Sequence, residues 1–111
     1  MHTEAPTFIA IQPILWRRPD GTEIMIEAKI GAPYRVDNQA WACPAALDGV
    51  DGRYPDIVGE GAIQALSLAI RLIGTRLGNM LADNAQLMHP VDRSAWDWPS
   101  HAAVFGGVPS N

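Results

Sequence analysis

The segment FIAIQPILWRRPDGTEIMIEAKI, residues 8–30, decides the fold because it reads as two strands joined by a tight turn. At its centre lies RPDGTE, residues 18–23. Proline presets a turn, Asp20 can hydrogen-bond the backbone that follows it, and Gly21 accepts a positive φ. The chain is therefore predicted to reverse here into a β-hairpin.

The two arms of this hairpin differ in pattern. Residues 23–30 alternate, with Ile24, Ile26, Ala28 and Ile30 on one face, which is typical of a half-buried antiparallel strand. Residues 8–18 are apolar on both faces, and Pro13 marks an edge position or a bulge because it cannot donate to a ladder. Something is expected to cover the second apolar face of this strand, formed by Ile9, Ile11 and Leu15.

Beyond the hairpin, residues 39–47 are predicted to form a third strand, and residues 48–61, rich in Gly, Asp and Pro, a long loop. Residues 61–84 then carry the apolar spacing of one long helix, which Asn84 is expected to end. The apolar stripe of this helix consists of Ile63, Leu66, Ile70, Ile73, Leu77 and Leu81, widened by Ala62, Ala69 and Met80.

These elements predict an α+β fold with a three- to four-stranded antiparallel sheet, a meander, packed by one long C-terminal helix. Residues 1–7 are expected to be a flexible N-terminus and residues 8–84 the α+β domain. Residues 85–111 are expected to be an extended or irregular aromatic tail that packs on the domain or on a partner.

Composition excludes several kinds of partner. The chain of 111 residues fits one domain, and its net charge of −4 does not suit nucleic acid, which requires a basic face. No apolar run approaches the roughly 20 residues of a membrane span. The single cysteine cannot form an internal disulfide, which suits the cytoplasm. We therefore expect a cytoplasmic protein with no nucleic-acid and no membrane partner.

The sequence offers no pattern for catalysis. Cys43 has no cation nearby in sequence to lower its pKa, so a buried core thiol is expected. His2, His89 and His101 lack the spacing of metal ligands, and no cofactor motif is present. The candidate nucleophiles Ser67, Ser94 and Ser100 have no obvious base partner. We expect no catalytic residue, metal or cofactor.

Two surfaces remain as candidates for binding. The start of the long helix, where backbone N–H groups could hold an anion, is the candidate ligand site, with Gly61, Gln64 and Trp41 as its residues. The candidate interface joins a second apolar line of the helix, two helix glycines that invite close approach, and two tail aromatics. Its residues are Ala65, Leu68, Leu72, Gly74, Gly78, Trp96 and Trp98.

Two short patterns occur together in order, Trp41-x-Cys43-Pro44 and, after a Gly-rich loop, Gln64-Ala65-Leu66-x-Leu68-Ala69. With them, residues 8 to about 83 resemble a family of small bacterial proteins grouped as a domain of unknown function. The resemblance implies a few antiparallel strands followed by one long helix, and it implies no activity or catalytic residue. It gives Gln64 more weight than a random polar residue.

The sequence favours a non-enzymatic protein that acts through protein–protein contact, with a protein partner or a homodimer expected. The alternative is a module that binds a small molecule or an anion at the helix start, residues 59–64. A pocket with converging polar groups would favour the ligand, and a flat apolar surface would favour the partner.

Overall fold

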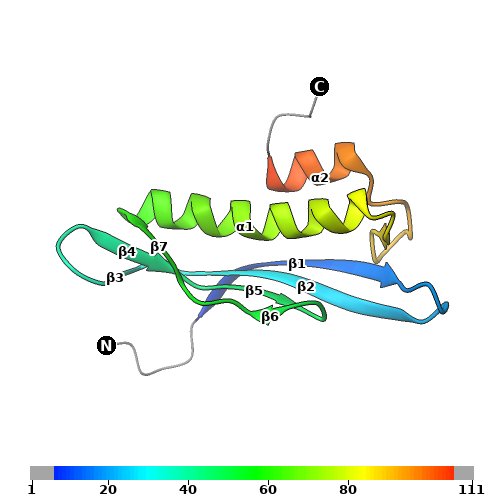
Figure 1. Ribbon diagram of the computed structural model, residues 1–111, viewed down its shortest axis with the longest axis horizontal. Coiled ribbons are helices and arrows are strands. Elements are labelled where there is room, and N and C mark those ends of the chain that lie inside the picture. Colours follow the sequence, from blue (N-terminus) through cyan, green and yellow to red (C-terminus); the bar gives the residue numbers. More distant parts are fainter. Residues whose placement is uncertain (1–6, 107–111) are drawn as a thin grey trace.

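The computed structural model describes residues 7–106, and it is an α+β fold with antiparallel sheets and a long helix laid across them (Figure 1). One sheet has five strands in the order β6-β5-β2-β1-β8, and the other has three in the order β3-β4-β7. The strands are β1 (Phe8–Arg17), β2 (Glu23–Gly31), β3 (Tyr34–Arg35), β4 (Ala40–Cys43), β5 (Ala45–Asp48), β6 (Gly52–Arg53), β7 (Ile57–Glu60) and β8 (Gln86–Met88). The helices are α1 (Ala62–Ala82) and α2 (Trp98–Phe105). The predicted residues 1–6 of the N-terminus and 107–111 of the tail lie outside the described residues.

The predicted hairpin between β1 and β2 is confirmed. Ile14 lies opposite Ile26, and both side chains are fully buried on the face that α1 covers. In the turn, Gly21 has a φ of 90° and donates its N–H to the Arg18 carbonyl at 2.9 Å. The Asp20 carboxylate accepts the Thr22 N–H at 2.9 Å, so each turn residue acts as its chemistry predicts.

The predicted third strand is two strands, so the expectation of a three- to four-stranded meander was wrong. Pro44 separates β4 from β5, and these two strands belong to different sheets. Pro44 has no N–H for a ladder, but its carbonyl accepts the Gly31 N–H at 2.8 Å. The predicted loop 48–61 also contains the short strands β6 and β7.

Helix α1 begins and ends close to its predicted limits. Asn84 has a φ of 67°, and the Ala85 N–H donates to the Met80 carbonyl at 2.9 Å, which is a left-handed helix termination. The buried face is rotated from the predicted stripe, because Ile63 is 82% exposed whereas Ala65 is fully buried. Small residues allow α1 to lie close to β7, since a Cβ on Gly59 of β7 would lie 2.7 Å from the Ala65 nitrogen.

The tail, expected to be extended or irregular, forms β8 and α2, so α1 is followed by a second helix. Leu87 of β8 pairs with Trp16 of β1, and the Trp96 side chain is 1% exposed. The Asp97 carboxylate caps α2 by accepting the Ser100 N–H at 2.9 Å, and Pro99 lies in the first turn. These residues are the usual start signals of a helix.

Candidate functional site

The start of α1 brings the three predicted ligand residues into one region. Trp41 pairs with Gly59 of β7, and the Gly61 N–H donates to the Gln39 carbonyl at 3.1 Å. The Gln64 amide oxygen accepts the Glu60 N–H at 2.5 Å, so this side chain fastens the helix to the strand before it. Gln64 thus has a structural task, and a ligand role for this region stays a prediction.

Cys43 is a buried core thiol, as predicted. Its side chain is 0% exposed, and Sγ donates to the Gly31 carbonyl at 3.4 Å. Burial raises the pKa of the Cys43 thiol, and the charge of Asp56 acts in the same direction. A thiol in this environment stays protonated at neutral pH and makes a poor nucleophile.

The acidic residue Asp51, in the loop after β5, makes structural contacts. The Asp51 carboxylate accepts the Tyr54 hydroxyl at 2.7 Å and the Arg76 Nε–H at 2.9 Å, which ties the loop to α1. The hydrogen bond from Tyr54 is the largest cause that lowers the pKa of Asp51. Among residues 7–106, no three His, Cys, Asp or Glu side chains gather closely enough to hold a metal ion, and His2 lies outside that range.

One pair of polar side chains was missed by sequence reasoning. The His89 Nε2 lies 3.2 Å from the Ser100 Oγ, so Ser100 does have a base beside it, contrary to expectation. The His89 ring packs against Trp96 with centroids 4.8 Å apart. Within the described residues no carboxylate hydrogen-bonds His89, so the orienting third group of a catalytic triad is missing and the pair links the loop before α2 to α2 itself.

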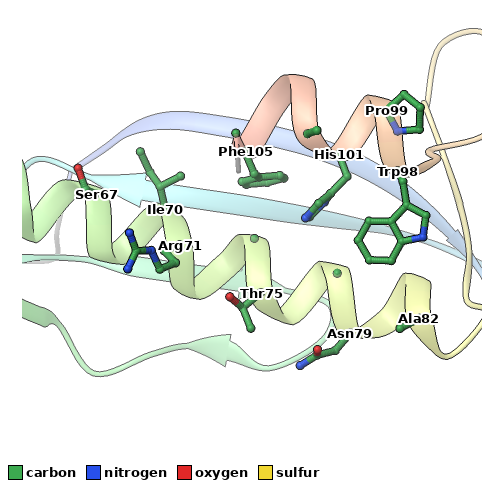
Figure 2. Close-up of a pocket in the computed structure, with 14 residues that line it drawn as sticks. Ser67, Ile70, Arg71, Thr75, Asn79, Ala82, Trp98, Pro99, His101 and Phe105 are labelled. Atoms are coloured by element: carbon green, nitrogen blue, oxygen red, sulfur yellow. The ribbon is translucent and has the colours of Figure 1, made fainter. Parts of the chain in front are cut away.

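The two helix glycines of the predicted interface lie under α2. A Cβ on Gly74 would lie 3.2 Å from the Phe105 Cβ, and one on Gly78 would lie 3.6 Å from both the Trp98 ring and the His101 Nε2. The chain's own tail therefore occupies the close approach that these glycines allow. A groove of about 1150 Å³ runs beside this contact, between α1 and α2 (Figure 2).

The other predicted interface residues differ in accessibility. Ala65 is 0% exposed and Trp96 is 1% exposed, which leaves them no surface to offer a partner. Leu68 and Leu72 on α1 are half-buried. Trp98 is 54% exposed on α2, so it is the aromatic member of the set with substantial surface.

An apolar surface that the sequence only partly indicated lies on β1. Its neighbour β8 pairs with β1 only at Leu15–Arg17, so in the described structure no strand pairs with the outer edge of residues 8–13. Ile9 is 60% exposed and Ile11 is 52% exposed, and Met25 of β2 is 50% exposed. We call residues 8–13 of β1 the open segment; of the apolar face expected to be covered, only Leu15 is buried.

Comparison with known proteins gives one match. The family model described as a domain of unknown function (DUF6968) matches residues 15–97, three quarters of the chain. No curated protein and no solved structure matches the chain. The matched span begins just after the open segment and ends just before α2.

No helix in residues 7–106 combines the length and the apolar character needed to cross a membrane.

Proposed function

The chain belongs to the DUF6968 family of domains of unknown function, and we propose that it is a non-enzymatic interaction module whose partner is a second copy of itself. One observation carries the proposal, namely the open segment of β1. It combines a strand edge that no strand pairs with in residues 7–106 and two isoleucines that are more than half exposed. Apart from Pro13, which has no N–H, such an edge presents free backbone N–H and C=O groups that can pair with another strand.

The side chains of the open segment suit a contact between identical surfaces. The chain has a net charge of −4, yet residues 8–14 carry no charged side chain. Two copies that meet at this segment therefore bring no like charges together there. In a symmetric pair an antiparallel alignment about Ala10 places Ile9 of each copy opposite Ile11 of the other, so both isoleucines lose exposure in one step.

Burial of the exposed isoleucines favours this association. Complete burial of such a side chain contributes about 1.5–3 kcal/mol, so the exposed half of each is worth about 1 kcal/mol. A symmetric interface uses each residue twice, which doubles the contribution of any one position. Replacement of one central isoleucine by lysine therefore removes two apolar contacts and places two cations close together.

Sedimentation velocity tests the proposal across a concentration series. The wild-type chain is expected to show a dimer that dissociates on dilution, and Ile11→Lys is expected to raise its dissociation constant at least tenfold. Ile63→Lys is the matched control, because Ile63 is 82% exposed on α1 and the substitution changes charge and size equally. This control is expected to sediment as the wild type does.

Two results would contradict the proposal. The first is a wild-type chain that stays monomeric up to on the order of 1 mM, where even weak specific contacts become populated. The second is equal dissociation of the two lysine variants, since that would place the contact away from β1. Circular dichroism of both variants checks that the fold persists.

We place this self-association in the cytoplasm, because the buried, unpaired Cys43 needs no oxidising compartment.

The alternative proposal, binding of a small molecule or anion at residues 59–64, has weaker support because the Gln64 side chain is engaged by Glu60. The variant Gln64→Ala separates self-association through β1 from ligand binding at residues 59–64. It would destabilise the start of α1 without changing the dissociation constant of the dimer.

A further inference from the structure

The groove between α1 and α2 has an unusual distribution of charge. Among the described residues that line it there is one cation, Arg71, and no carboxylate, although the chain as a whole has a net charge of −4. The α1 side includes polar side chains spaced four residues apart, together with Ile70, Ala82 and two glycines, and the α2 side carries aromatic rings (Figure 2). The polar residues are Ser67, Arg71, Thr75 and Asn79, and the rings are those of Trp98, His101 and Phe105.

Arg71 differs from the other cations of the chain. Each of the other seven Lys and Arg side chains contacts a carboxylate, a backbone carbonyl or, for Arg18, the face of Trp16. Within residues 7–106, Arg71 has no ion pair and no side-chain hydrogen bond. A planar guanidinium with its donors unused is suited to a carboxylate, which it can bind through two parallel hydrogen bonds.

His101 supplies a second unused polar group in the same groove. The residue is 9% exposed, and its buried Nδ1 has no hydrogen-bond partner among the described residues. The ring points from α2 towards α1, between Phe105 and Trp98 (Figure 2). A buried nitrogen without a partner is costly, so His101 marks a wall of the groove that the described residues alone do not complete.

We propose that the α1–α2 groove binds a small planar aromatic carboxylate. Its carboxylate pairs with Arg71, within reach of the Thr75 hydroxyl, and its ring extends along α1 towards Trp98. From Arg71 to Gly78, where Trp98 contacts α1, the helix rises about 10 Å, which matches a fused two-ring acid. The ring stacks on the exposed Trp98, since aromatic pairs favour offset contact.

A two-dimensional ¹H–¹⁵N NMR titration with 2-naphthoate tests this proposal, with neutral 2-naphthalenemethanol as the matched ligand. Saturable shifts are expected at the amides of residues 71–79 and at the Trp98 indole N–H. For a ligand of this size the expected dissociation constant is about 1 mM or tighter. The alcohol is expected to bind at least tenfold more weakly, because it cannot pair with Arg71.

Arg71→Gln should weaken naphthoate binding at least tenfold and leave the binding of the alcohol unchanged. Arg18→Gln is the matched control, since Arg18 is also exposed but lies in the β1–β2 turn. Because both arginines are on the surface, neither substitution is expected to unfold the chain. Spectra of the two variants without ligand that match the wild-type spectrum will confirm this. Shifts centred elsewhere, equal binding of acid and alcohol, or no saturable shift at about 10 mM naphthoate would each overturn the proposal.

Discussion

At the scale of single residues, small side chains set how closely α1 approaches the sheets. Gly59 of β7 faces the backbone of α1, and a Cβ there would lie 2.7 Å from the Ala65 nitrogen. Ala65 and Ala69 on the helix are both fully buried. Because the clash would be with backbone and not with a movable side chain, this contact tolerates no added methyl group without a shift of the helix.

Gly59→Ala is therefore expected to lower the free energy of unfolding by about 2 kcal/mol, in the range of overpacked cores. Urea unfolding followed by circular dichroism measures this change. Ser67→Ala, on the exposed side of the same helix, should change the free energy by less than about 0.5 kcal/mol. Equal stability of Gly59→Ala and the wild type would show that β7 and α1 are not held this closely.

His101 makes stability depend on pH. Burial lowers the pKa of His101 below its ordinary value of 6.5, and a hydrogen bond with the Gly74 backbone opposes that shift in part. The unfolded chain takes up a proton near that value while the folded chain resists it, so stability is full above it and falls as pH drops through it.

The loss of stability between about pH 7 and pH 5 should become smaller in His101→Gln. Carboxylates whose pKa is lowered, such as Asp20 and Asp37, titrate below this interval. We therefore assign the change in stability within the interval to histidine. Urea unfolding at several pH values measures the slope for both proteins. An unchanged slope in the variant would mean that the pKa of His101 is the same in the folded chain as in the unfolded chain.

At the scale of elements, α2 is held on α1 by rings that lie against glycines. Gly78→Leu places a side chain where the Trp98 and His101 rings lie, with the nearest ring atoms 3.6 Å from the added Cβ. We expect α2 to leave α1, with a red shift of tryptophan fluorescence and faster proteolysis of residues 89–97. The sheets should keep their far-ultraviolet circular dichroism.

Thr75→Leu is the matched control for this displacement, because Thr75 is an exposed residue of the same helix. Its fluorescence and its proteolysis should match those of the wild type. If Gly78→Leu behaves like Thr75→Leu, the contact between α1 and α2 does not depend on the missing side chain.

Elements that depend on residues adjacent in the chain were predicted from the sequence, whereas the break at Pro44 and helix α2 were missed. The β1–β2 turn and the end of α1 at Asn84 each depend on residues adjacent in the chain, and both were predicted. The break at Pro44 was missed because Trp41, Cys43, Ala45 and Leu47 keep the alternation of one strand across it. Helix α2 was missed although Asp97 and Pro99 are ordinary start signals, because tryptophans and prolines around them suggested an irregular tail.

The candidate sites were harder to predict because they depend on tertiary contacts. The groove brings Arg71 of α1 together with Trp98 and His101 of α2, and no spacing in the sequence indicates this proximity. The open segment was foreseeable in part, since β1 is apolar on both faces. Only the short reach of β8 shows that Ile9 and Ile11 stay exposed.

At the scale of the whole molecule, the fold buries the centre of one face of its larger sheet under α1 and leaves part of β1 open. The core lies between that sheet and α1, whereas β8 pairs with β1 only at Leu15–Arg17 and does not reach the open segment. Exposed apolar strand edges are a liability that proteins usually block with charge or with a covering element. In the proposed dimer, a second copy of the chain would provide such a cover.

Isotope-filtered NMR on an equal mixture of labelled and unlabelled chains tests this claim most directly, because it detects only contacts between copies. We predict intermolecular NOEs between the methyl groups of Ile9 and Ile11, and their disappearance in Ile11→Lys. Intermolecular NOEs confined to other residues, or none in a sample concentrated to about 1 mM, would contradict self-association through β1.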